Sequence, residues 1–284
     1  MAMEIAPLPG ALGARITGID LSQDIEAETI AAIHAAWLEH LVLVFPDQEL
    51  TADTQVRFTE KFGALGLRKR NVARPEGDDV HPGVMLITNI REDGKPIGSL
   101  PDGEMMFHSD GAYSAEPFRY TLLYAIDVPP VGGDTLFANM YRAFDTLPGA
   151  LKRRLADCHG CHEYYAGSVQ KDAPSGDYSG GYVHPLFIEH EETHRTALFV
   201  SRLITTRIEE MPADESDAVL EELFAHAERP EFVYRHVWAK GDFVLWDNRC
   251  SNHARTDFPE TERRQMRRTT VLGTAPAAAR LQAA

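Results

Sequence analysis

The sequence predicts a mainly β protein with flanking helices, built around a barrel or a jelly roll. Seven short segments rich in β-branched and aromatic residues are spread between residues 84 and 272. Turn signals such as Gly132-Gly133-Asp134 and Lys240-Gly241-Asp242 separate them. Within this region, helical periodicity is limited to three stretches between these segments. Many short strands joined by Gly- and Pro-containing turns are typical of barrels and jelly rolls whose helices pack outside.

The length of the chain is compatible with a single domain. At 284 residues it could hold one large domain or two small ones, and β barrels with added helices often reach this size alone. The apolar fraction of 44% and the charged fraction of 25% are ordinary for a globular protein and exclude disorder or a fibre. We therefore expect one domain over residues 1–284.

The charge balance excludes some classes of partner. There are 28 Lys and Arg residues against 43 Asp and Glu residues, which gives a net charge of −15. Such a chain is repelled by nucleic acid and by anionic membrane surfaces. Apolar runs reach only about five residues, where a membrane span needs about 20. The start of the chain lacks a secretory pattern, and three cysteines do not make a disulfide scaffold, so we expect a reducing, cytoplasmic location.

The first 83 residues alternate strands and helices. Short strands are expected around residues 4–5 and 14–16, followed by an amphipathic helix over 26–39 and a buried strand over 41–45. Thr51 is the expected N-cap of a second helix that runs through Phe62 and ends at Gly63. Residues 66–83 mix charges, Pro and Gly, so we expect a long mobile loop beside the functional site.

From residue 84 onward the pattern is mostly of strands. Strands are predicted over residues 84–88, 119–127, 135–138, 197–200, 231–238, 243–246 and 267–272. Helices are predicted over residues 139–146, 149–157 and 213–227. A second mobile loop is expected near residues 166–185, which are rich in Gly and Pro.

A metal-binding pattern stands out at residues 108–110. On an extended strand, the side chains of His108 and Asp110 point to the same face and can reach one metal ion. The best third ligand is His253, which lies 143 residues after Asp110 and follows a predicted strand. Two histidines and one carboxylate leave three positions of an octahedron open, the arrangement of non-haem Fe(II) oxygenases. Alone, a His-x-Asp pair also fits a surface turn whose histidine makes ordinary hydrogen bonds.

A basic segment over residues 263–270 favours an anionic ligand. If it is a strand, Arg264 and Arg268 share one face with Met266 and Thr270. That face would place two guanidinium groups inside a barrel, where they need an anion as a partner. The alternative is an ordinary solvated basic surface.

These features occur in one order along the chain. The order is His108-Ser109-Asp110, Gly132-Gly133-Asp134-Thr135, Trp246-Asp247-Asn248-Arg249, His253, Arg264 and Arg268. This series resembles the taurine dioxygenase and 2,4-dichlorophenoxyacetate dioxygenase (TauD/TfdA) family of Fe(II)- and 2-oxoglutarate-dependent enzymes. The resemblance extends from Gly18 to Gly273.

The resemblance implies a fold, a reaction and a set of site residues. The fold is a double-stranded β-helix, which is a distorted jelly roll. His108, Asp110 and His253 would bind Fe(II), and the distal carboxylate of 2-oxoglutarate would pair with Arg264 and accept a hydrogen bond from Thr135. Arg268 would lie near both cosubstrate and substrate. The reaction consumes O₂, hydroxylates a small organic substrate and releases succinate and CO₂, and members often form homodimers or homotetramers.

Three positions bear on the substrate. Glu104 stands where the taurine and phenoxyacetate enzymes carry Asn, so it could meet a substrate amine or pair with a neighbouring Arg. Arg68 falls near a substrate-contacting His of the taurine enzyme and could attract an anion, or it could be part of a solvated loop. Ile204 replaces a Phe and would enlarge the pocket. We expect a small-to-medium organic acid, a carboxylate or a sulfonate.

Two other functions use some of the same residues. A cupin-like barrel could bind a metal and an organic acid without turnover, and a hydrolase could use the three ligands with zinc. Dependence on 2-oxoglutarate separates the oxygenase from both. The pattern Cys158-x-x-Cys161-His162 matches covalent haem attachment, but we interpret it as a strand with buried cysteines and exposed histidines.

Overall fold

Two facing β-sheets form the centre of the molecule. The computed structural model describes residues 3–67, 81–100, 103–165, 167–170 and 178–280. Arg68 and most of the predicted loop at 66–83 therefore lie outside the described residues. The larger sheet has seven strands, in the order β1 (Glu4–Pro7), β2 (Ala14–Thr17), β3 (Val42–Phe45), β16 (Phe243–Asp247), β8 (Tyr120–Asp127), β18 (Gln265–Val271) and β4 (Met85–Thr88).

The smaller facing sheet carries three of the functional candidates, His108, Thr135 and His253. Its order is β15 (Val233–His236), β9 (Thr135–Asn139), β17 (Ser251–Arg255) and β7 (Met105–His108). Apolar side chains of both sheets, such as Leu123 and Phe137, belong to one buried cluster between them. The predicted jelly-roll core is therefore confirmed.

Three further small sheets extend this core. They are β11 (Tyr178–Pro185), β10 (His159–Tyr165) and β14 (Thr205–Ile208); β13 (Thr196–Leu198), β12 (Phe187–Glu189) and β19 (Ala277–Ala278); and β5 (Arg91–Glu92) with β6 (Lys95–Pro96).

The first of these sheets corrects two expectations. Residues 178–185 were predicted to be part of a loop but pair with β10, since backbone pairing with a partner strand tolerates the glycines there. The strand expected around Cys161 exists, but His162 is only 1% exposed, because its ring packs beside Phe199 and its Nδ1 bonds the Thr205 hydroxyl.

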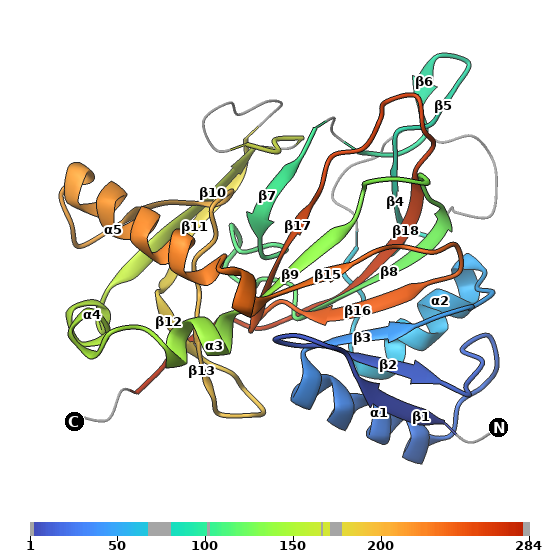
Figure 1. Cartoon of the computed structure of the whole chain (residues 1–284), viewed down its shortest axis with the longest axis horizontal. Coiled ribbons are helices and arrows are strands. Elements are labelled where there is room, and N and C mark those ends of the chain that lie inside the picture. The colour runs from blue at the N-terminus through green and yellow to red at the C-terminus, as the bar shows by residue number, and fades with distance from the viewer. Residues whose placement is uncertain (1–2, 68–80, 101–102, 166, 171–177, 281–284) are drawn as a thin grey trace.

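Five α-helices of the described part of the chain lie outside the sheets (Figure 1). They are α1 (Ala27–His40), α2 (Ala52–Thr59), α3 (Met140–Asp145), α4 (Gly149–Leu155) and α5 (Ala213–Ala227). In Figure 1, α1 lies beside β1 and β2 at the bottom of the view, and α3, α4 and α5 lie on the left side of the molecule. Among the residues described, no helix is long and apolar enough to cross a membrane.

Helix α2 begins as predicted and ends earlier. Thr51 caps it by accepting from the Thr54 backbone N–H, and the Thr54 hydroxyl accepts in return from the Thr51 N–H. The α-helix stops at Thr59 and tightens into a 3₁₀ turn, η1 (Glu60–Phe62), before Gly63. A second 3₁₀ turn, η2 (Pro230–Phe232), occupies the start of the strand predicted over 231–238.

Strand β8 separates the interior of the jelly roll from the helix-covered face. Tyr120, Leu122 and Tyr124 pack with α1 and α2 in one cluster, while Leu123 and Ala125 join the cluster between the sheets. Because side chains alternate along a strand, Thr121 shares the interior face.

Strand β18 departs from the expectation of one buried face. Arg268 lies on the interior side, as predicted, but the neighbouring Arg267 is also buried. Arg267 Nε donates to Gln55 Oε1 at 2.9 Å, and its guanidinium lies over the Tyr124 ring. Helix α2 therefore covers the second face, and only the tertiary structure shows this.

Candidate metal centre

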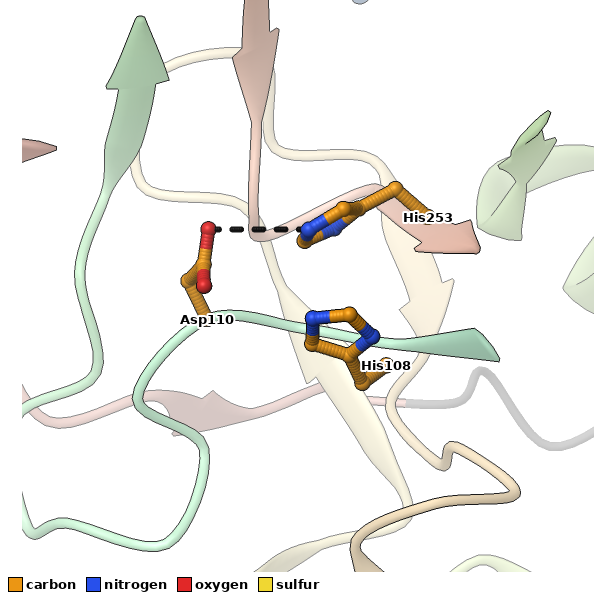
Figure 2. A group of neighbouring side chains, drawn as sticks. All are labelled: His108, Asp110 and His253. Carbon is orange, nitrogen blue, oxygen red and sulfur yellow. Dashed lines mark ion pairs between the residues drawn. The ribbon is translucent and has the colours of Figure 1, made fainter. Parts of the chain in front are cut away.

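The three predicted ligands meet where β7 and β17 pair. The antiparallel register places His253 directly opposite His108, with ring centroids 4.1 Å apart (Figure 2). Asp110 lies in the turn two residues beyond the end of β7, and not on an extended strand as expected. Its Oδ2 still lies 3.8 Å from His253 Nε2, because the turn folds back toward β17. The three ligand atoms lie within 4.8 Å of one another.

Both histidines are neutral and suited to bind a metal. His108 Nδ1 lies 3.0 Å from the carbonyl oxygen of Met106, which can only accept, so Nδ1 carries the proton and Nε2 keeps a free lone pair. Burial lowers the pKa of His108, and burial together with the neighbouring His108 ring lowers the pKa of His253 to about 3. Trp246 packs against His253 at 4.7 Å between centroids and keeps this side of the site apolar.

Asp110 is an anion despite its burial. Burial raises the pKa of this carboxyl, but Arg268 opposes this most strongly, followed by His253 and His108, and the balance lowers the pKa to about 2. Arg268 Nη1 donates to Asp110 Oδ1 at 3.0 Å. Two neutral imidazoles and one carboxylate are the donor set of non-haem Fe(II) sites, so the residues fit this metal.

A second buried cluster of metal-ligating residue types has a different character. His190, Asp247 and Cys250 also lie within ligating distance of one another. Nε2 of His190 bonds Asp247 Oδ2 at 2.9 Å, and its Nδ1 accepts from the backbone N–H groups of Glu192 and Thr193. Both ring nitrogens of His190 are thus engaged in hydrogen bonds, so His190 has no free lone pair for a metal.

Arg264 is a buried cation that a bound anion would stabilise. Its side chain is 2% exposed and lies against the Gly133 turn, and its Nε has no hydrogen-bond partner among the described residues. Burial and the nearby Arg255 lower the pKa of Arg264 to about 9, although Asp134 acts in the opposite direction. A buried guanidinium that lacks full compensation is stabilised when a carboxylate binds.

Thr135 supplies a hydroxyl donor two residues after Gly133, which lies against Arg264. It is the first residue of β9, and its Oγ1 accepts from Trp238 Nε1 at 2.9 Å. Because an indole N–H is only a donor, the Thr135 hydroxyl keeps its own proton for another acceptor. Arg255 pairs with Thr135 across β9 and β17, which adds a second buried guanidinium to this region. The sequence motifs did not single out Arg255.

The turn before Thr135 requires glycine. Gly132 and Gly133 have φ of +79° and +69°, and a Cβ on Gly132 would lie 2.3 Å from the backbone oxygen of Asp257. The glycines therefore allow the 257–258 segment to approach β9 closely. This approach brings Gly133, and with it the start of β9, against Arg264.

Two tyrosines near Arg268 were not predicted as site residues from the sequence. Tyr113 and Tyr164 stack with centroids 5.2 Å apart at an interplanar angle of 26°, and both are half-buried. Burial raises the pKa of each hydroxyl, and the positive charge of Arg268 opposes it in both. Tyr113 follows Asp110 by three residues, which is the signal that could have revealed it.

Of the other predicted substrate residues, Ile204 is buried and Glu104 is exposed. Ile204 is buried in the core, and the preceding Leu203 donates to the carbonyl of Phe107, so this segment lies beside β7. The Glu104 side chain is exposed just before β7 and forms no ion pair within the described part of the chain. Its backbone carbonyl accepts from Gln170 Nε2 at 3.0 Å.

Residues 4–270 match the model of one protein family, described as "Taurine catabolism dioxygenase TauD, TfdA family". The chain is 34% identical to the (S)-phenoxypropionate/alpha-ketoglutarate-dioxygenase of Sphingobium herbicidovorans, over 96% of each chain. It is 33% identical to pentalenolactone F synthase of Streptomyces avermitilis, over 97% of this chain and 96% of that one. The crystal structure of a taurine dioxygenase from Burkholderia xenovorans superposes with a TM-score of 0.82 at 30% identity, over 99% of this chain and 95% of that one.

Proposed function

The chain belongs to the TauD/TfdA family of taurine catabolism dioxygenases, and on this premise we propose how its own residues perform the reaction. The protein is an α-ketoglutarate (2-oxoglutarate)-dependent dioxygenase, as its relatives over nearly the whole chain are named. The observation that carries the proposal is the adjacency of an ionised Asp110 and two neutral histidines.

His108, Asp110 and His253 hold Fe(II) in this proposal. When bound, Fe(II) with 2-oxoglutarate and O₂ supplies an oxidant that replaces a substrate C–H bond with C–OH, while the cosubstrate becomes succinate and CO₂. The two imidazoles donate neutral lone pairs and Asp110 contributes a negative charge, so the protein offsets one of the two positive charges of the metal. Since only three ligands come from the protein, the other positions stay available to cosubstrate and O₂.

Arg264 and Thr135 orient the cosubstrate. The guanidinium supplies charge-assisted donors, and the Thr135 hydroxyl, held by Trp238, supplies one more to the distal carboxylate. Their burial excludes water and strengthens these bonds. The keto-acid end of the cosubstrate is thereby directed toward the three ligands.

The substrate is proposed to be a small organic anion with an apolar body. Arg268 supplies a partly buried cation beside the ligands, and the stacked rings of Tyr113 and Tyr164 supply an apolar wall. The relative named for phenoxypropionate acts on a substrate of this description. Arg68 and Glu104 stay candidates for further substrate contacts, and Ile204 stays a candidate for the pocket wall.

We also propose that the protein is cytoplasmic and forms a homodimer or homotetramer. All three cysteines are free and buried, which supports a reducing compartment. The assembly state is measured by sedimentation equilibrium of the purified protein.

An anaerobic titration with Fe(II) and 2-oxoglutarate, followed by visible absorption, tests the proposal. We expect a weak charge-transfer band in the wild type, diminished in Asp110→Ala and in Arg264→Ala. Arg263→Ala is the matched control, because Arg263 is one residue away but exposed and paired with Asp127. A wild-type protein that binds metal without producing the band would favour the cupin-like binding barrel or the zinc hydrolase.

A further inference from the structure

The Asp110 carboxylate is held by a buried network that the metal-ligand pattern does not contain. Its Oδ2 accepts from the Thr121 hydroxyl at 2.7 Å, while Oδ1 accepts from Arg268. Thr121 lies in β8 on the interior face and is fully buried. A lone hydroxyl on the interior face of this strand, among Leu123 and Ala125, needs a partner, and Asp110 is that partner.

The next member of the network is Asn248, which is 1% exposed. Its Nδ2 donates to Thr121 Oγ1 at 2.9 Å. Its Oδ1 accepts from Trp246 Nε1 at 3.1 Å and from the Asp110 backbone N–H at 3.3 Å. Its backbone is fixed as well, since its carbonyl accepts from the Ser109 hydroxyl.

The direction of every proton in this network follows from its ends. An indole N–H and a backbone N–H are only donors, so the atom of Asn248 that they meet is the amide oxygen. The other amide atom is therefore NH₂, which donates to Thr121. The Thr121 oxygen thus receives a hydrogen bond and directs its single proton to Asp110 Oδ2.

We propose that Thr121 and Asn248 are positioning residues that fix the orientation of the Asp110 carboxylate for metal binding. The oxygen that Thr121 holds is the one that faces His253 Nε2. Without this bond, Arg268 is the side-chain hydrogen-bond donor that the described residues still offer to the carboxylate, so rotation about its χ2 angle is less restricted. This proposal rests on the proposed metal site and adds to it two residues that do not touch the metal. Hydrogen bonds of this kind to metal ligands typically contribute 10–100-fold to affinity.

The test is the dissociation constant for Mn(II), measured from the electron paramagnetic resonance signal of unbound Mn(II). Thr121→Val has nearly the shape of threonine but no hydroxyl, and we expect its dissociation constant to rise about 10–100-fold. Thr121→Ser restores the hydroxyl and should bind within about threefold of the wild type. Asn248→Asp removes the NH₂ donor, so the Thr121 hydroxyl donates to the carboxylate at position 248 instead of to Asp110. The affinity for Mn(II) should therefore fall as in Thr121→Val.

Thr270→Val is the matched control. Thr270 is the cross-strand neighbour of Thr121 in β18 and is also buried, so its replacement tests the loss of any buried hydroxyl at this level of the sheet. Its Mn(II) affinity should equal that of the wild type. Thermal melting without metal shows which variants are folded.

The outcomes separate failure of the positioning role from failure of the proposed metal site. If the folded Thr121→Val variant binds Mn(II) like the wild type, or if Thr121→Ser is as weak as Thr121→Val, the positioning role is wrong. If Thr121→Val does not fold, Asn248→Asp decides in its place. A wild-type protein that does not bind Mn(II) contradicts the metal site itself, a result distinct from failure of the positioning role.

Discussion

Arg268 Nη1 donates a 3.0 Å hydrogen bond to Asp110 Oδ1, although the two residues lie 158 positions apart in the chain. A cation that the sequence linked to a substrate anion thus also contacts a proposed metal ligand. The Arg268 charge is the largest influence that lowers the pKa of the buried Asp110 carboxyl. One guanidinium therefore connects the proposed metal site with the proposed substrate site.

The first prediction concerns Arg268. Replacing it with Met removes the cation proposed to attract the substrate anion, so the KM of a carboxylate substrate should rise about 10–100-fold, the equivalent of one charge-assisted bond. The KM of the corresponding neutral amide should change little. Steady-state succinate release with both compounds measures this, and an equal rise for acid and amide would contradict the role.

The second prediction concerns Arg264. In Arg264→Met the dissociation constant of 2-oxoglutarate should rise about 10–100-fold, because the distal carboxylate loses its charged donor. A 2-oxo acid that has no distal carboxylate, such as 2-oxobutyrate, should bind wild type and variant equally. Isothermal titration with both acids in the presence of Mn(II) measures this difference. An equal loss of affinity for the two acids would show that Arg264 does not bind the distal carboxylate.

The third prediction concerns the stability of the α2–β18 contact. Arg267→Met leaves Gln55 Oε1 and the Leu50 carbonyl without their donor, and should lower the free energy of unfolding by about 2 kcal/mol. Gln55→Leu should also lower the free energy of unfolding, because Gln55 Nε2 donates to the buried Arg267 carbonyl at 2.9 Å. Urea denaturation measures both variants. Arg263→Met, at an exposed position, is the control and should change little.

The fourth prediction concerns the pH dependence of stability. Burial, followed by the charge of His184, lowers the pKa of His162 to about 3, against about 6.5 in an unfolded chain. The folded state therefore disfavours the protonated ring. This contribution to stability is complete above pH 6.5 and is lost as the pH falls toward 3, at about 1.4 kcal/mol per pH unit.

Urea denaturation at pH 7 and pH 5 tests the histidine. The wild type should lose about 2 kcal/mol from this group between the two pH values, and His162→Gln should show a smaller loss by that amount. His194→Gln, at an exposed position, should keep the wild-type difference. An unchanged difference in His162→Gln would show that another group causes the acid sensitivity.

The sequence by itself determined the class of fold and most candidates for the site. Strand and helix periodicity depends on neighbouring residues, so the strands of the large sheet and the cap at Thr51 were predicted close to where they lie, whereas β17 was not predicted. The pattern His108-x-Asp110 is also local and identified two proposed ligands. His253 was singled out because it follows a predicted strand, and Arg264 because it shares a strand face with Arg268.

Only the tertiary structure decided which distant groups touch. The register that places His253 opposite His108 depends on pairing between strands far apart in the chain. Thr121 and Asn248 are separated by 127 positions, and no spacing in the sequence links them. Burial of Arg267 by α2 and burial of His162 were missed for the same reason. Hydrogen bonds and packing between remote segments follow from how the sheets fold together, and this leaves no local period in the sequence.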